Sequence, residues 1–518
     1  MKFERASGIL LHPTSLPSKF GIGDIGPEAV RWVDFLAEAG CKIWQILPLG
    51  PTGYGDSPYQ CFSAFAGNPY LISLELLLAE DLLTPSDLED IPEFPPDRVD
   101  FGAVIPWKLS LLDRAYLRFN QREKSAEIQQ EYVRFRAEQA SWLDDFAHFM
   151  ALKEYYGGKP WSQWEAELRD RQPEAIQQSR QQLSEAISRQ AFRQFLFFRQ
   201  WEGLRRYVRE KGVLIIGDIP IFVAHDSADV WAHPELFYLD HKGQPKFVAG
   251  VPPDYFSPTG QLWGNPLYRW KAHKEQGYRW WLERFRAVLS TVDIVRLDHF
   301  RGFAGYWQVS GKATTAEKGR WVPGPGKHFL KALQHELGEL PIIAEDLGVI
   351  TPDVVALRDS FNLPGMKILQ FAFADGPGDP FLPHNYPRHC VVYTGTHDND
   401  TARGWYERVP EEEKSFYRRY LSRDGSNVSW DLIRAVWASV AVYAIAPLQD
   451  FLSLGNEARM NYPGRPSGNW SWRMPEGCLT PELQGRIYEI NYLYSRLAGQ
   501  EAVRPESSIP ENYFRWRR

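Results

Sequence analysis

Eight short apolar runs, most of them ending in polar residues, follow one another along the chain. They lie at residues 8–12, 41–47, 213–220, 293–297, 341–348, 366–373, 391–398 and 440–450. Continuous apolar runs of this kind are typical of strands that are buried on both faces. Helical segments separate them, and strands that alternate with helices form parallel sheets. Eight such strands in series predict an α/β protein with a (β/α)8 TIM barrel rather than an open sheet.

The spacing of the runs leaves room for two large insertions. The 518 residues are enough for two to four domains, but a barrel with insertions absorbs the same length as one unit. Residues from about 70 to 210 carry long charged amphipathic runs, which predict a mostly helical insertion. A second insertion spans about 226–290, and its stretch 250–266 is so rich in proline and glycine that we expect no regular structure there. We therefore predict a single barrel over residues 1–518.

Charge and composition narrow the classes of partner. The net charge of −6 and the isoelectric point of about 6.1 give no support for nucleic acid or an anionic membrane, because both favour basic surfaces. We expect an uncharged substrate. The four cysteines are widely spaced and lack C-x-x-C geometry, so neither a disulfide framework nor a zinc cage is indicated. With no apparent signal peptide and no apolar run long enough to span a membrane, a cytoplasmic location is expected.

Aromatic residues make up 14% of the chain, and several fall in polar, glycine-rich or proline-rich stretches where loops are expected. These are Tyr54, Tyr59, Tyr255, Phe256, Trp263 and Trp470. Flat amphipathic rings in polar loops suit the apolar face of a sugar, whose hydroxyl groups form hydrogen bonds around the edge. Packing in the core is the alternative for each ring taken alone.

Arg296 and Asp298 stand at the polar end of the run 293–297. Side chains two residues apart on a strand point to the same side, which predicts a guanidinium beside a carboxylate. An adjacent cation favours the ionised carboxylate and lowers its pKa, as a carboxylate nucleophile requires. A structural ion pair is the alternative, because ion-pair networks also perturb pKa values.

Glu345 and Asp398 lie at the ends of two further runs. Together with Asp298 they place three carboxylates at the C-terminal ends of three strands, where barrel enzymes gather their catalytic groups. Glycoside transfer with retention needs one ionised and one protonated carboxyl group. The apolar residues before Glu345 predict partial burial, which raises the pKa of a carboxyl group and keeps it protonated.

Binding of a divalent metal is the alternative role for three converging carboxylates, since His299, His397 and Asp400 lie close to them in sequence. The aromatic loops and Arg296 favour sugar chemistry, because a cation competes with a metal for the same oxygen atoms. We therefore expect no metal and no cofactor.

Several segments closely resemble the 4-α-glucanotransferases of glycoside hydrolase family 77. The most specific are Asp293-Ile-Val-Arg-Leu-Asp-His-Phe-Arg-Gly-Phe303, Ile343-Ala-Glu-Asp-Leu-Gly348 and Thr394-Gly-Thr-His-Asp-Asn399, which resemble the catalytic segments of that family. The resemblance also covers residues 10–17, 55–59, 217–223, 250–266 and 468–473, so it extends over essentially the whole chain. It implies an α-amylase-like barrel without the separate C-terminal β-domain that many relatives carry.

By this resemblance Asp298 is the nucleophile, Glu345 the general acid/base and Asp398 the stabiliser of the transition state. The stretch 250–266 is similar to the loop that covers the donor cleft in the family. Positions that match the sugar subsites of the family are Tyr59, Gln261, Trp263, Asp375 and Asn469. The substrate-binding set that we predict also includes Ser57, Asp218, Tyr255, Phe256, Arg296, His299 and His397.

The implied reaction transfers a segment of an α-1,4-glucan to the 4-hydroxyl of an acceptor glucan or glucose, by a retaining double displacement. α-1,4-Glucans and maltooligosaccharides are the expected partners, and the protein is expected to be a monomer or a weak oligomer. Two alternatives stay open, namely an amylase-type α-1,4-glucan hydrolase and a non-catalytic glucan-binding protein. The aromatic residues alone would permit the latter.

Overall fold

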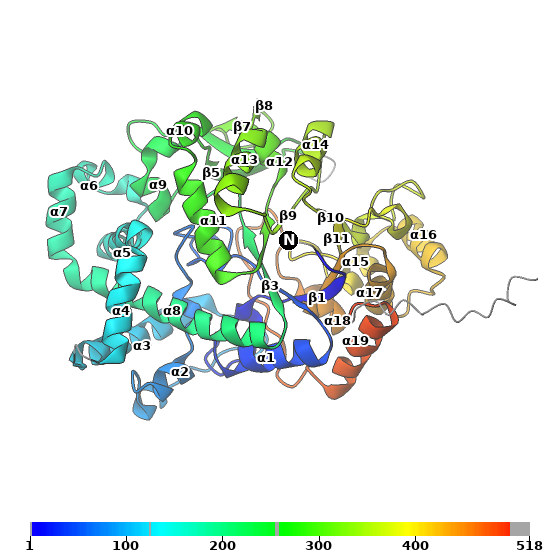
Figure 1. The fold of residues 1–518 in the computed structure, drawn as a ribbon, viewed down its shortest axis with the longest axis horizontal. Coiled ribbons are helices and arrows are strands. Elements are labelled where there is room, and N and C mark those ends of the chain that lie inside the picture. Colours follow the sequence, from blue (N-terminus) through cyan, green and yellow to red (C-terminus); the bar gives the residue numbers. More distant parts are fainter. Residues whose placement is uncertain (1–2, 124–125, 254–257, 498–518) are drawn as a thin grey trace, which may run out of the picture.

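Eight parallel strands form the central barrel (Figure 1). The computed structural model describes residues 3–123, 126–253 and 258–497. The strands are β1 (Ala6–Leu10), β2 (Ile43–Gln45), β3 (Leu214–Ile219), β6 (Ile294–Leu297), β9 (Ile342–Ala344), β10 (Gly365–Ile368), β11 (Cys390–Tyr393) and β12 (Tyr443–Pro447). Their order is β10-β11-β12-β1-β2-β3-β6-β9, and the Ala344 N–H donates to the Pro364 carbonyl at 2.9 Å where the two end strands meet. The predicted (β/α)8 barrel is confirmed.

Helices pack around the outside of the barrel. α8 lies against β3, α11 against β6 and α17 against β12. The helices that follow the strands along the chain are α1 (Pro27–Glu38), α8 (Ser184–Glu210), α11 (Arg279–Thr291), α13 (Gly326–Leu337), α14 (Pro352–Ser360), α15 (Ala402–Arg408), α16 (Glu411–Leu421), α17 (Val428–Ala438) and α19 (Pro481–Leu493). Short helices accompany them: α9 (Ala228–Ala232), α10 (Trp270–Glu275), α12 (Arg301–Ala304) and α18 (Leu448–Phe451).

A group of helices fills the chain between β2 and β3. Figure 1 places these helices at the left, on the side of the barrel remote from α15 to α19. They are α2 (Leu74–Ala79), α3 (Phe101–Gln121), α4 (Glu127–Glu138), α5 (Ala140–Tyr155), α6 (Ala166–Arg169) and α7 (Pro173–Gln182). α8 packs against α3, α4, α5 and α7 and also against the barrel strand β3, so it joins this helical group to the barrel. Among the residues that the structure describes, no helix is long and apolar enough to cross a membrane.

A second sheet lies beside the barrel and was not predicted. It is antiparallel, in the order β5-β4-β7-β8, with β4 at Phe247–Val251, β5 at Gln261–Pro266, β7 at Gly305–Ser310 and β8 at Gly319–Pro323. The expectation that the whole stretch 250–266 is irregular is therefore wrong. The strand tolerates its glycine and proline because the pairing of β4 with β5 shifts register, and Pro266 stands at the end of β5.

The two ends of the described chain meet at the start of β1. This strand lies between β12 and β2, so its pairing joins residues from opposite ends of the sequence. The guanidinium of Arg496 is buried and donates to the carbonyls of Ala6 at 2.8 Å and Ala441 at 3.1 Å. Arg5 donates to the Ser439 carbonyl at 2.8 Å and the Tyr494 carbonyl at 3.1 Å. The base of the barrel is thus tied together by hydrogen bonds from two arginines to backbone carbonyls.

Candidate active site

Asp298, Glu345 and Asp398 all follow C-terminal ends of barrel strands. Asp298 comes directly after β6, Glu345 directly after β9, and Asp398 lies in the loop after β11. The segments after β6 and β9 are joined, because the Phe300 N–H donates to the Glu345 carbonyl at 3.0 Å. Tyr59 connects them to the loop after β11, because its ring stacks on His397 and its hydroxyl donates to Asp218, which Arg296 also contacts. The three carboxylates therefore share one mouth of the barrel.

Arg296 links Asp298 to a fourth carboxylate, that of Asp218. Its Nη2 lies 2.9 Å from Asp298 Oδ1, and its Nη1 donates to Asp218 Oδ2 at 2.6 Å. Asp218 stands opposite Arg296 in the β3–β6 ladder, and both side chains are buried. The predicted neighbourhood of Arg296 and Asp298 is confirmed. The sequence did not predict that the same guanidinium is shared with Asp218.

Glu345 is the buried carboxyl group of the site. Its two oxygens accept hydrogen bonds from backbone N–H groups, that of His299 at 2.7 Å and that of Leu347 at 2.8 Å. Burial and the nearby charge of Asp298 raise the pKa of Glu345 to about 7, against the opposing effect of Arg296. The expected burial and raised pKa are both present. A carboxyl group with this pKa can hold a proton near neutral pH and release it.

Asp398 is exposed and is oriented by the segment that follows β12. Asn461 Nδ2 donates to Asp398 Oδ1 at 2.6 Å, and Arg459 Nη2 donates to the Asp398 carbonyl at 2.6 Å. His397 Nε2 lies 3.5 Å from the same carboxylate oxygen. Sequence reasoning missed Arg459 and Asn461. They lie in an irregular loop, and only their position beside Asn469 in an aromatic stretch hinted at a role.

Aromatic rings form one wall beside these carboxylates. Tyr59 stacks on His397 with ring centres 5.0 Å apart and lies 5.7 Å from Trp470. The Tyr59 hydroxyl donates to Asp218 Oδ2 at 2.8 Å. Burial, together with the charge of Asp218, raises the pKa of Tyr59 well above its ordinary value, so the hydroxyl keeps its proton. Tyr59 thus connects the aromatic wall to the charged centre.

Trp263 and His299 form a second contact beside Asp298. The edge of one ring meets the face of the other, with centres 4.8 Å apart and planes at 84°. Trp263 Nε1 also donates to Gln261 Oε1 at 3.2 Å. The backbone of His299 has a φ of 51°, which is uncommon for a residue with a side chain. Burial lowers the pKa of His299 to about 4, so the ring is neutral near pH 7.

Some of the predicted substrate-binding residues have other contacts in the structure. Ser57 Oγ accepts from the Tyr59 N–H at 3.2 Å, so it positions that ring. Asn469 accepts from the Tyr462 N–H and donates to the Arg465 carbonyl, which holds its own loop together. Asp375 lies in the segment after β10 and is exposed. After burial, its negative charge is a further cause that raises the pKa of Asp379 and of Glu413. Tyr255 and Phe256 lie outside the described residues.

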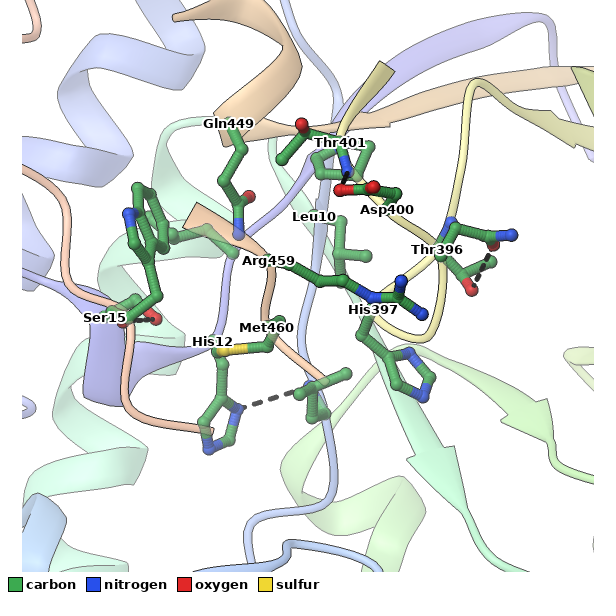
Figure 2. Close-up of a pocket in the computed structure, with 15 residues that line it drawn as sticks. Leu10, His12, Ser15, Thr396, His397, Asp400, Thr401, Gln449, Arg459 and Met460 are labelled. Carbon is green, nitrogen blue, oxygen red and sulfur yellow. Dashed lines mark hydrogen bonds between the residues drawn. The ribbon is translucent and has the colours of Figure 1, made fainter. Parts of the chain in front are cut away.

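A pocket lined by His397 lies between β1, the loop after β11 and residues 459–472 (Figure 2). His12 lines it and accepts from the Leu47 N–H at 3.3 Å, and burial lowers the pKa of His12 to about 3. Asp400 also lines it, but its carboxylate is engaged by Arg408 and by Asn456 Nδ2 at 2.8 Å. Over the described ranges, no group of three or more His, Cys, Asp or Glu side chains is arranged to hold a metal ion.

Comparison with known proteins places this geometry in a family. The family model of glycoside hydrolase family 77, described as 4-alpha-glucanotransferase, matches residues 11–480. This chain belongs to the 4-alpha-glucanotransferase family. A 4-alpha-glucanotransferase from Thermus thermophilus is 53% identical over 505 residues, which cover 96% of this chain and 100% of that relative. A chloroplastic/amyloplastic 4-alpha-glucanotransferase from Solanum tuberosum is 45% identical, over 95% of this chain and 87% of that relative.

A solved structure agrees with the sequence comparisons. The structure of an amylomaltase from Streptococcus agalactiae in complex with acarbose is 41% identical, with a TM-score of 0.92 over 95% of this chain and 100% of that one. The family assignment identifies the protein as an enzyme that transfers segments of α-1,4-glucans. Both the family and the activity predicted from the sequence are therefore confirmed for this chain.

Proposed function

We propose that Asp298 is the nucleophile and Glu345 the general acid/base of a retaining glucan transfer. The observation that carries this assignment is the contrast between the two groups. The positively charged Arg296 guanidinium lies 2.9 Å from the Asp298 carboxylate, whereas burial raises the pKa of Glu345 to about 7. One ionised and one protonated carboxyl group are the pair that a double displacement requires.

In the first step, Asp298 attacks C1 of a glucosyl unit in the donor while Glu345 gives its proton to the departing glycosidic oxygen. The C1–O bond breaks, the shortened glucan leaves with a free 4-hydroxyl, and a β-linked glucosyl-enzyme ester forms. In the second step, the ionised Glu345 takes the proton of an acceptor 4-hydroxyl. The acceptor oxygen then displaces Asp298 from C1 and restores the α-1,4 linkage. The two inversions give net retention.

The neighbouring side chains complete the proposal. Asp398, held by Asn461, binds ring hydroxyls of the distorted glucosyl unit, and Tyr59 supplies an aromatic surface beside it. Trp263 and His299 contact the sugar on the side of the antiparallel sheet. Asp218 keeps Arg296 in place through the 2.6 Å hydrogen bond and thereby supports Asp298. Gln261, bonded to Trp263, and the predicted loop residues Tyr255 and Phe256 stay in the proposed binding set.

Incubation with maltotriose alone tests the balance between transfer and hydrolysis. A transferase converts maltotriose into longer oligosaccharides plus glucose, with no net gain of reducing ends. An α-glucan hydrolase releases one new reducing end for every bond that it cleaves. A stoichiometric rise in reducing ends without longer products would reject transfer as the main reaction.

Azide rescue of two variants tests the separate roles of the carboxylates. With α-maltosyl fluoride as donor, fluoride leaves without a proton, so Glu345→Ala still forms the covalent ester. Azide then displaces Asp298 and gives an α-maltosyl azide. In Asp298→Ala, azide attacks the donor directly from the opposite side and gives the β-anomer. The same anomer from both variants would contradict the assignment.

We further propose that the enzyme acts in the cytoplasm on maltooligosaccharides derived from starch or glycogen, as a monomer or weak oligomer. The four free cysteines support a reducing location. The division into one catalytic barrel over 1–518, a helical insertion at about 70–210 and a second insertion at about 226–290 is likewise a proposal. Sedimentation of the purified enzyme tests the oligomeric state directly.

A further inference from the structure

Trp321 is the most exposed tryptophan within the described residues. It is 42% exposed, whereas the other described tryptophans are buried or half-buried. An exposed Trp ring leaves a large apolar surface in water. Trp321 lies on β8, the edge strand of the antiparallel sheet, near the top of Figure 1.

The register of the sheet places Trp321 on the face turned away from the catalytic residues. Leu262, Gly250, Trp307 and Trp321 stand opposite one another across β5, β4, β7 and β8. Leu262 and Trp307 pack on a separate apolar cluster of Val248, Val309 and Ala316, whereas Trp263 packs against the main core of the barrel. Trp263 contacts His299 in the active site. Trp321 is therefore separate from the catalytic cleft described above.

Neighbouring groups fix the Trp321 ring in place. The Arg301 guanidinium lies over the ring, 3.8 Å from its centre. The Trp307 ring lies 5.3 Å away at an angle of 64°, and its Nε1 donates to the Ala316 carbonyl at 2.9 Å. A side chain at Gly319 would come within 2.4 Å of the Trp307 ring, so glycine is needed there. A ligand therefore meets a preorganised surface and loses little affinity to ordering the ring.

Arg301 also connects this surface to the catalytic segments. It begins α12 shortly after Asp298, and it donates to the carbonyls of Gly305 at 3.5 Å and of Val349 in the segment after Glu345. Val349 is itself 59% exposed. The Trp321 surface thus lies where the chain segments that carry the nucleophile and the acid/base reach the outside of the protein.

We propose that Trp321 is a platform that binds a glucan chain outside the catalytic cleft. The proposal rests on the transfer activity toward α-1,4-glucans described above. The occupant is the outer part of a long α-1,4-glucan, because a rigid aromatic face fits the apolar face of a glucose unit. Long glucans are thereby retained near the active site, and short maltooligosaccharides do not need the platform.

Affinity electrophoresis of the full-length protein in native gels, with and without soluble amylose, tests the platform. Trp321→Ala should weaken amylose binding about 3- to 10-fold relative to wild type, and Trp321→Phe, which keeps a ring, should lose less. Tyr155→Ala is the matched control, because Tyr155 is 59% exposed on α5 of the helical insertion. The control should be retarded like wild type.

Activity and sedimentation distinguish a glucan platform from a purely structural tryptophan and from a contact between copies of the chain. The kcat/KM of Trp321→Ala should fall for amylose but not for maltotriose. Equal losses for both substrates would indicate a structural defect, and unchanged amylose retardation would overturn the proposal. A shift to a smaller oligomer in Trp321→Ala would assign the surface to contact between copies instead, which also rejects it. If wild type does not disproportionate maltotriose, the proposed function fails, whereas binding to amylose is measured independently.

Discussion

The Arg296 guanidinium is shielded from solvent and lies 2.9 Å from Asp298 Oδ1. Arg296→Gln removes the positive charge while keeping a polar side chain of moderate size. We expect kcat on maltotriose to fall about 100- to 1,000-fold, as when a preorganised charge-stabilising group is lost from other active sites. Arg296→Lys keeps the charge but cannot bridge Asp218 and Asp298, so its activity should be intermediate. Activity of Arg296→Gln within tenfold of wild type would show that the pair is mainly structural.

The raised pKa of Glu345 predicts the alkaline side of the pH profile. Its ordinary value is 4.5 and burial raises it to about 7, so the protonated acid persists up to neutral pH and is lost above it. We expect kcat/KM for maltotriose to fall about tenfold per pH unit above this value. The leaving group of α-maltosyl fluoride needs no proton. With this donor, the alkaline fall in kcat/KM, which reports the first step, should disappear. Identical alkaline limbs for both donors would assign the ionisation to another group.

Asn461 is predicted to position Asp398 through its 2.6 Å hydrogen bond. Asn461→Ala leaves the carboxylate chemically intact but frees its orientation. We expect kcat to fall about 10- to 100-fold with a smaller change in KM, since the loss is largest in the transition state. Asn461→Asp should be worse than Asn461→Ala, because it adds a like charge beside Asp398. A change confined to KM would place Asn461 in ground-state binding.

His273 is predicted to weaken the fold in acid. Its ring is buried among Tyr268, Trp270 and Trp280, and burial lowers its pKa from 6.5 to about 4. Below pH 6.5 the histidine is protonated in the unfolded chain but stays neutral in the folded protein. The free energy of unfolding therefore falls as pH drops from 6.5 to about 4. One such group contributes about 1.4 kcal/mol per pH unit in that window.

Urea unfolding between pH 4 and 7 measures this effect. His273→Phe should show a shallower fall in the free energy of unfolding than wild type, whatever its absolute stability at neutral pH. The exposed His328, changed to Gln, serves as the control and should follow wild type. Parallel curves for wild type and His273→Phe would contradict the prediction.

Local patterns in the sequence were enough to predict the barrel and its charged centre. All eight barrel strands coincide with apolar runs, because strands buried on both faces need continuous apolar side chains. The side-by-side placement of Arg296 and Asp298 follows from the alternation of side chains along a strand. The burial of Glu345 follows from the apolar residues before it. These features depend on neighbours in the sequence.

Features that depend on distant partners could not be predicted in this way. Strand β5 contains glycine and proline and is stabilised by its pairing with β4. Asn461 reaches Asp398 from a loop that has no periodic pattern, and Asp218 meets Arg296 only because β3 and β6 are neighbours in the barrel. The antiparallel sheet was missed for the same reason. A single sequence does not reveal which residues far apart along the chain become neighbours.

The position of β1 between β12 and β2 has a consequence for synthesis of the protein. Asp298, Glu345 and Asp398 have all been translated before Tyr443–Pro447 leaves the ribosome, yet β1 has one unpaired edge until then. The unpaired edge of a strand readily pairs with other chains. The nascent chain thus carries all three proposed catalytic carboxylates on an open, aggregation-prone sheet. Chaperone demand during expression should therefore end only when the last barrel strand has emerged.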